Sequence, residues 1–389
     1  MNTGKYVFAQ IAAYLDHNEF NRCVTAYDGN YKVQHFTCWH QFLCMMFGQL
    51  SNRESLSDLI ICLQSHQGSF YHLGIGKGSS KANLAKANEN RDYRIYESFA
   101  YSLIKEARTI LKNEESSIKL RTPVYALDAT VVDLCLSIFW WGKFRRNKAA
   151  VKINTLFDIK TNIPTFIQIT SGGIHEINVL DSLAFETGGF YIMDKGFIDF
   201  ERFYRINKDG VFFLTRAKSN FRYKRLYSAP VKKSENIRCD QTVILKNDLV
   251  SKKYPGKLRR IKYYDSETNT RLIFMTNNFD LKATEIAQLY KYRWKIELFF
   301  KWIKQHLKIK SFWGHSFNAV KTQIYIAIIT YVLVAIIKHK QRIKQSQYEI
   351  LQILGVSLLC KTQLNQLFDK PQIHNYNEST RNQLNIFEL

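Results

Sequence analysis

Three carboxylates stand at positions where an acidic side chain is costly. Asp128 lies inside the apolar stretch VYALDATVV, Asp194 closes the stretch GGFYIMD, and Glu297 lies in LYKYRWKIELFFKWIKQHLKI, which is rich in aromatic and aliphatic residues. Strand interiors disfavour Asp, and an unpaired buried carboxylate costs several kcal/mol. A divalent cation removes that cost, because it brings the opposing charge to the carboxylates. Taken alone, each Asp is equally compatible with a turn or a strand end.

The segment from Leu289 to Ile309 predicts one helix that is buried over most of its circumference. At about 100° per residue, the polar side chains fall within a stripe of roughly 80°. They are Tyr290, Arg293, Glu297, Lys301 and Lys304. The alternative is a solvated face with i,i+4 pairs, in which Arg293 and Lys301 neutralise Glu297.

Metal-assisted phosphodiester cleavage and transfer is the chemistry that uses such a set. Three carboxylates can hold two Mg²⁺ ions about 3.5–4 Å apart, one activating the attacking water or 3′-hydroxyl and the other stabilising the leaving oxygen. Oxygen ligands favour Mg²⁺, with Mn²⁺ as a substitute. The predicted catalytic residues and metal ligands are Asp128, Asp194 and Glu297. The predicted phosphate-binding residues are Tyr290, Arg293, Lys301 and Lys304, because cations and hydroxyl donors bind phosphate oxygens.

The charge of the chain points to a polyanionic partner. Its 389 residues contain 56 Lys and Arg against 33 Asp and Glu, which gives a net charge of +23. This excess favours nucleic acid, although a merely basic, soluble protein is the alternative. The bias is strongest from Lys218 to Lys262, with fourteen cations, three acids and several aromatic residues. Such a surface suits phosphate contacts and base stacking, and a solvated β-rich insertion is the alternative.

We expect the protein to be cytoplasmic and to have no membrane partner. The apolar run from Ile324 to Ile337 is shorter than the roughly 20 residues of a membrane span, so it predicts a helix buried on all sides. The first residues lack the apolar core of a signal peptide. The seven cysteines show no metal-finger spacing and are expected to be reduced and mostly buried.

The pattern of the chain predicts five regions. Residues 1–115 have helical periodicity and are expected to form a helical N-terminal domain that binds DNA ends or serves packing or dimerisation. Alternating strands and helices at 116–217 and 273–316 predict an α/β core with a mixed sheet, interrupted by a basic β-rich insertion at 218–272. Residues 317–389 are expected to be helical again.

The motifs together resemble a known family. Tyr290, Arg293, Glu297 and Lys304 reproduce the signature Y-x2-R-x3-E-x6-K, and LDAT around Asp128 and MDKGF around Asp194 resemble its two aspartate motifs. The chain is thereby similar to DDE-type transposases of bacterial insertion sequences.

This resemblance implies a ribonuclease-H-like catalytic core, with Asp128 on the first strand, Asp194 on the fourth and Glu297 on the late helix. It also implies double-stranded DNA partners, namely the terminal inverted repeats and target DNA. A homodimer would hold two ends in a synaptic complex, and excision would be cut-and-paste, with hairpinned ends. Some family members capture a flipped base with a Trp of the insertion, but no Trp occurs between Lys218 and Lys262.

Two other classes stay open, a DNA-binding relative without catalysis and a hydrolytic nuclease of the same fold. The basic, aromatic stretch FWWGKFRRNK either touches DNA or is a solvated turn. His175 and Glu176 are interpreted as supporting or structural residues. The remaining carboxylates considered are expected to be surface or helix residues, and they are Asp133, Asp158, Asp181 and Asp199.

Overall fold

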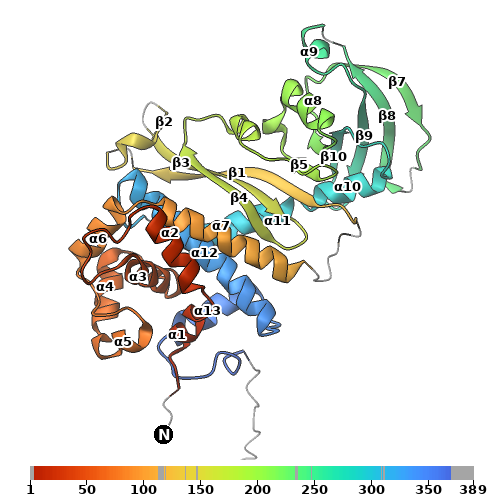
Figure 1. Ribbon diagram of the computed structural model, residues 1–389. Helices are drawn as coiled ribbons and strands as arrows, with labels where there is room; N and C mark the ends of the chain where they lie inside the picture. Colours follow the sequence, from red (N-terminus) through yellow and green to blue (C-terminus); the bar gives the residue numbers. More distant parts are fainter. Residues whose placement is uncertain are drawn as a thin grey trace, which may run out of the picture.

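The protein combines one long sheet with a layer of helices, as seen in a computed structural model (Figure 1). The structure describes residues 4–112, 118, 120–135, 137–145, 148–232, 235–246, 248–307, 309 and 312–368. The expected boundary at 115–116, part of the FWWGKFRRNK stretch and the chain beyond Phe368 lie outside the described residues.

The N-terminal region is helical, as its periodicity predicts. It contains α1 (Val7–Ala12), α2 (His17–Ala26), α3 (Cys38–Leu50), α4 (Leu56–Gln64), α5 (Phe70–Leu73), α6 (Lys81–Asn90) and α7 (Arg94–Leu111). Side-chain caps fix several starts; Thr37 and Ser55, for example, accept from backbone N–H groups of α3 and α4. The C-terminal helices α12 (Phe317–Lys340) and α13 (Gln347–Ser357) join the same helical layer.

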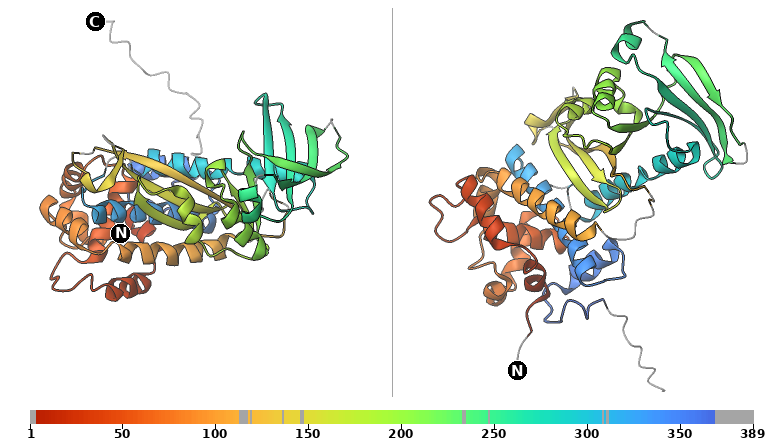
Figure 2. Two further views of the ribbon diagram at one scale, coloured as in Figure 1. Left: turned by 90° about the horizontal axis from the view of Figure 1, so that it is seen from above. Right: turned by 45° about the vertical axis from the view of Figure 1, so that its right-hand side comes forward.

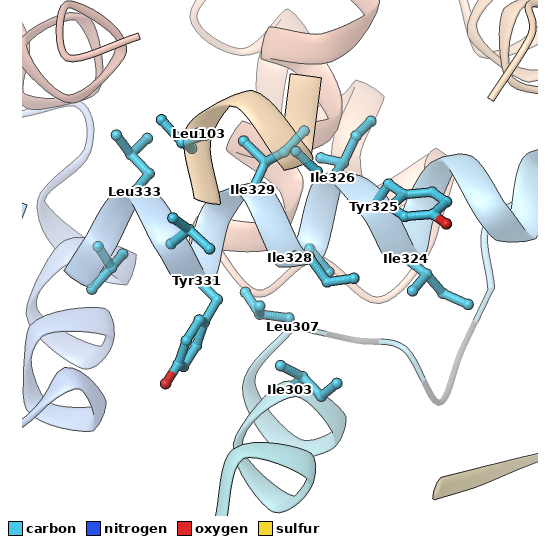
Figure 3. Close-up of a cluster of buried hydrophobic side chains, with 14 of the residues drawn as sticks. Leu103, Ile303, Leu307, Ile324, Tyr325, Ile326, Ile328, Ile329, Tyr331 and Leu333 are labelled. Carbon is cyan, nitrogen blue, oxygen red and sulfur yellow. The ribbon is translucent and has the colours of Figure 1, made fainter. Parts of the chain in front are cut away.

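Helix α12 forms the centre of that layer. Figure 3 shows Leu103 of α7 on one side of it, and on the other side Ile303 of α11 (Trp294–His306) and Leu307, which follows that helix. Of the described helices, α12 alone is long and apolar enough to cross a membrane, and 94% of its apolar window is buried inside the protein. The expectation of a helix buried on all sides is confirmed, and the helix is longer than the run that predicted it.

The sheet contains ten strands among the described residues. They are β1 (Val124–Leu134), β2 (Lys143–Arg145), β3 (Lys148–Asp158), β4 (Ile163–Ser171), β5 (Phe190–Met193), β6 (Phe212–Arg216), β7 (Tyr223–Ala229), β8 (Ile237–Leu245), β9 (Leu258–Asp265) and β10 (Thr270–Thr276). The order is β2-β3-β1-β5-β6-β10-β9-β8-β7, and β4 also pairs with β3. Pairs β1–β5 and β5–β6 are parallel and the others antiparallel, so the expected mixed sheet is confirmed.

The basic insertion extends this sheet at one end. Strands β7, β8 and β9 continue it past β10 and project from the core (Figure 2). Helix α8 (Phe200–Lys208) packs on β6, and the short α9 (Asp248–Lys253) packs on β8 and on α8.

The segment TPVYALDATVVDLCLSIF contributes the single strand β1, which ends at Leu134. The stretch after His175 forms a short 3-10 turn, Glu176–Asp181. The expectation that the cysteines are mostly buried was wrong: all seven are free, but Cys135 and Cys360 are exposed and two others are only half-buried.

The segment from Leu289 to Ile309 is also not one helix. It is divided between α10 (Ala283–Lys291) and α11 (Trp294–His306). Between them the backbone makes tighter i→i+3 bonds, from Arg293 N to the carbonyl of Tyr290 and from Ile296 N to that of Arg293. This joint lets α10 pack on the insertion end of the sheet while α11 packs on β1.

Candidate active site

The two aspartates lie side by side at the centre of the sheet. Strands β1 and β5 run parallel with Leu127 opposite Met193, and the next residues are Asp128 and Asp194. A pair of residues at the same register of adjacent parallel strands lies about 5 Å apart along the hydrogen-bonding direction. The apolar runs that precede both residues make these strands, so the sheet itself positions the two carboxylates.

Arg293 connects the third carboxylate to this pair. Its guanidinium donates from Nη1 to Asp128 Oδ2 at 2.9 Å and from Nη2 to Glu297 Oε1. The i,i+4 pair considered as an alternative is therefore present, but not on a solvated face, because the Arg293 side chain is only 15% exposed. The side chains of Asp128 and Glu297, 169 residues apart in the chain, share one guanidinium.

Arg216 makes the equivalent contact with Asp194 and was missed by the sequence interpretation. It ends β6, the parallel neighbour of β5, and donates from Nη2 to Asp194 Oδ1 at 2.9 Å. One sequence signal could have indicated it: Arg216 ends the apolar stretch VFFLTR, which is the next predicted strand after the one that ends at Asp194. The parallel strands β1, β5 and β6 thus bring Asp128, Asp194 and Arg216 to the site.

Tyr290 lies between the two arginines. Its ring is 5.8 Å from the guanidinium carbon of Arg293 and 5.9 Å from that of Arg216. The residue is only 7% exposed, and its buried hydroxyl makes no well-aligned hydrogen bond among the described residues, although it lies within reach of the Arg293 guanidinium. The Nε atoms of Arg216 and Arg293 are buried in the same way. Buried donors are nearly always satisfied in proteins, so these three indicate a place for an acceptor such as a phosphate oxygen.

The environment separates the pKa values of the two aspartates. Burial raises the pKa of Asp128 to about 6, against the opposing charge of Arg293 and with repulsion from Asp194 and Glu297. Burial acts on Asp194 as well, but the hydrogen bond from Arg216, a backbone N–H and the nearby guanidinium charges outweigh it and lower its pKa. The mutual repulsion follows from the closeness of the three carboxylates in one site.

The two lysines of the predicted stripe have different positions. Lys304 donates from Nζ to the carbonyl of Val131 at 2.8 Å and so ties α11 to β1, three residues beyond Asp128. Lys301 is exposed. Tyr290 belongs to α10, so the expected single helical stripe is wrong as geometry, although the joint still brings Tyr290, Arg293 and Glu297 together.

The other polar candidates have structural partners. His175 accepts from the N–H of Ile177, and a Cβ on Gly196 would lie 2.5 Å from Glu176, so that carboxylate packs beside the second aspartate motif. Asp133 is exposed, Asp181 pairs with Arg202 and Arg205, and Asp199 caps α8. The expectation of a surface or helix position was wrong for Asp158, which is buried at the end of β3 and pairs with Arg108.

The donor set suits a hard divalent cation. Among the described residues, no three His, Cys, Asp or Glu side chains have their ligand atoms arranged to hold a metal ion. Instead, Arg293 and Arg216 supply positive charge to the three carboxylates. All ligands on offer are carboxylate oxygens, the chemistry that Mg²⁺ and Mn²⁺ prefer. The three carboxylates therefore fit such an ion if it takes the place of the Arg293 and Arg216 guanidinium groups that now contact them.

The insertion presents cations and rings on its open face. Arg238, Lys262 and Arg271, from three adjacent strands, line an open hollow of about 1080 Å³ together with Tyr264. The guanidinium of Arg238 lies 5.2 Å from the Tyr264 ring centre. Not every cation of the insertion is available, since Arg259 is buried in an ion pair with Asp240. Lys233, counted in the same charge run, lies outside the described residues.

Comparison with known proteins identifies the family. A family model described as a transposase DDE domain matches residues 119–333, more than half of the chain, and a domain of unknown function matches residues 3–76. The chain therefore belongs to the transposase DDE domain family. Within that family it is a DDE-type transposase of an insertion sequence, with an α/β core built on a mixed sheet.

Several relatives carry transposase names. The chain is 33% identical over 267 residues to y4zB of Sinorhizobium fredii, covering 67% of this chain and 72% of the relative. It is 26% identical to proteins named for element IS5377 of Geobacillus stearothermophilus (56% of this chain, 57% of the relative) and IS4SA of Synechocystis (66% and 71%). A solved structure, the piggyBac transposase synaptic complex with hairpin DNA, gives a TM-score of 0.46 at 10% identity, covering 96% and 84%.

Proposed function

We propose that this transposase binds the terminal inverted repeats of its own element and catalyses metal-dependent DNA cleavage and strand transfer. The observation that carries the proposal is the junction of Asp128, Asp194 and Glu297 around two arginines at the centre of the sheet. Bound Mg²⁺ or Mn²⁺, two ions per site, would activate the attacking oxygen and stabilise the leaving one.

The residues of this chain have separate tasks in the proposal. Asp128, Asp194 and Glu297 hold the metal ions. Tyr290 and the two arginines donate to non-bridging oxygens of the phosphate, because their buried hydroxyl and Nε groups have no other partner among the described residues. Lys304 holds α11 against β1 and keeps Glu297 opposite Asp128. Lys301, exposed on the same helix, contacts the DNA backbone farther from the carboxylates.

The proposal extends to the larger assembly. A cytoplasmic homodimer would hold two element ends and then target DNA, with the N-terminal helices and the basic insertion as DNA-binding surfaces. Hairpinned ends and base capture by an aromatic residue of the insertion follow from the family resemblance alone. The exposed Tyr227 is a candidate for that capture.

The test separates three activities. Purified protein is incubated with Mg²⁺ and a duplex that carries the inverted repeat flanking the gene, and in parallel with a pre-cleaved 3′-hydroxyl end and a target plasmid. The proposal predicts cleavage at the repeat boundary and joined products in the second reaction. Binding without cleavage would identify a silent DNA-binding relative, and cleavage without joining would identify a hydrolytic nuclease.

A further inference from the structure

The tip of the hairpin between β1 and β3 presents a large aromatic side chain to solvent. Trp140 lies in the 3-10 turn Trp140–Gly142 and is 78% exposed, and the nearby Ile138 is also exposed. A single exposed apolar residue is common on protein surfaces. Trp140 differs from such a residue because its two chain neighbours, Phe139 and Trp141, are aromatic and pack against other parts of the protein.

Those neighbours fix the turn to the segment that leads into α12. The ring of Phe139 is buried and contacts the ring of His315 at 5.4 Å between centroids. Trp141 donates from Nε1 to the carbonyl of His315 at 2.7 Å, and its ring lies 4.8 Å from that of Phe317. These contacts fix the backbone at Trp140 while its ring stays exposed. Binding through that ring should therefore lose little conformational entropy.

Charge selects the kind of partner. Between Cys135 and Lys152 the sequence contains five cations and no carboxylate. A second copy of the chain carries the same net charge of +23 and would be repelled by this stretch. A polyanion that also offers flat rings, which is nucleic acid, complements both the charge and the indole.

The sheet places the tip in line with the candidate active site. Strand β1 carries Asp128 and ends at Leu134, and the turn packs back on that end because a Cβ on Gly142 would lie 3.3 Å from the Leu134 side chain. Six residues of strand span about 20 Å. Duplex DNA rises about 3.4 Å per base pair, so this distance corresponds to about six base pairs. The hairpin and the insertion lie at opposite ends of the sheet, with β5 and β6 between them (Figure 1).

We propose that Trp140 stacks on a base of DNA bound across the sheet, about six base pairs from the phosphate at the carboxylates. The inference rests on the proposed function, because that function places DNA at Asp128. An indole inserted from outside unstacks or kinks one base step, which positions the strand for cleavage without reading its sequence.

The test is a binding cycle between the side chain and the base. The probe is a 40-base-pair duplex ending in the inverted repeat, used intact and with one abasic site placed in turn at positions 4 to 8 from the cleavage point. Binding is measured for the native protein, Trp140→Ala and Trp140→Phe, with Tyr348→Ala on α13 as an exposed aromatic control. Cleavage of the intact duplex by native protein and by Asp128→Asn is followed in parallel.

Stacking predicts that Trp140→Ala weakens binding to the intact duplex by about 5- to 100-fold, while Trp140→Phe retains most of the affinity. When the abasic site lies at the position that Trp140 contacts, Trp140→Ala should weaken binding by less than about twofold. The missing base and the missing indole remove the same contact, so their effects do not add. The inference would be overturned if Trp140→Ala bound the intact duplex within about twofold of the native protein. It would also be overturned if Trp140→Ala lost only self-association, measured by sedimentation, and kept its affinity for DNA. Cleavage that survives Asp128→Asn would instead overturn the proposed function, whatever Trp140 does.

Discussion

At the scale of single residues, the site is a set of charges whose balance depends on neighbours from distant parts of the chain. Asp128 and Asp194 occupy equivalent positions on parallel strands, yet their pKa values move in opposite directions. The difference follows from the partners, since Arg293 is shared with Glu297 whereas Arg216 faces Asp194 alone among the described carboxylates. Paired groups with separated pKa values are typical of catalytic sites.

The raised pKa of Asp128 predicts a pH-dependent stability difference. Its folded-state pKa of about 6 lies above the ordinary value of 3.8, so the folded state binds more protons between these values and loses stability as pH rises through the window. Relative to Asp128→Asn, the native free energy of unfolding should therefore increase by about 1–3 kcal/mol from pH 7 to pH 4. Urea unfolding at both pH values measures it.

Asp194→Asn is the matched control for that experiment. The pKa of Asp194 is lowered, so its contribution to stability is present at neutral pH and is lost as pH falls. The native-minus-variant difference should therefore change in the opposite direction. The same sign for both variants would show that the environments of the two aspartates are not as described.

The buried hydroxyl of Tyr290 gives a second prediction at this scale. Since it makes no well-aligned hydrogen bond among the described residues, Tyr290→Phe should leave the free energy of unfolding unchanged or raise it by about 1 kcal/mol. DNA cleavage should nevertheless fall by about tenfold or more if the hydroxyl donates to the phosphate. Tyr254→Phe removes another buried hydroxyl without a partner and serves as control. Equal cleavage by both variants would exclude the phosphate contact.

At the scale of elements, the joint between α10 and α11 decides the geometry. The sequence around Tyr292 contains neither Gly nor Pro, so periodicity alone predicts one continuous helix. Tertiary packing divides it, because Tyr290 packs on Phe274 of β10 while Phe299 packs on Phe157 of β3. The types of the candidate site residues were therefore predictable from isolated motifs, whereas the relation between the two helices was not.

The same limit explains Arg216. Asp128, Asp194 and Glu297 stand out because a carboxylate in an apolar segment violates local preferences, and such a violation is visible in one sequence. A cation at the end of a strand violates nothing, and its role arises only when β6 pairs with β5. Strand pairing across 20 residues or more is not encoded in any local pattern, so long-range partners of predicted residues are the part that requires the structure.

Helix α12 provides a test of packing at the element scale. Ile328 is buried where α12 lies near α11 (Figure 3). Truncation there leaves a cavity, so Ile328→Ala should reduce the free energy of unfolding by about 2–5 kcal/mol. Val356→Ala, at an exposed position of α13, should change it by less than about 0.5 kcal/mol. Denaturant titration compares them, and equal effects would mean that α12 is not central to the core.

At the scale of the whole molecule, positive charge is distributed along the sheet. The insertion and the hairpin tip lie at its two ends, and the carboxylates lie between them. A duplex laid along this line would meet cations over much of its length. Association with DNA should therefore depend steeply on salt, because each neutralised phosphate releases counterions.

The insertion's share of that dependence can be measured. Replacing Arg238, Lys262 and Arg271 with Gln should flatten the slope of log K against log salt by about 2–3 units, since each duplex phosphate contact contributes about 0.9. Arg342→Gln with Lys344→Gln, exposed beyond α12, should leave the slope unchanged. An unaltered slope in the insertion variant would place the DNA elsewhere.

The most direct test of the account asks whether the three carboxylates act as one metal-dependent site. Cleavage of an inverted-repeat duplex is measured in Mg²⁺ and in Mn²⁺ for Asp128→Asn, Asp194→Asn and Glu297→Gln, with Asp133→Asn, an exposed carboxylate on the same strand as Asp128, as control. Each of these three variants should lose cleavage at least a thousandfold while binding the duplex within about threefold of native, and the control should cleave normally. Cleavage retained by any one of the three would contradict a single metal-dependent site.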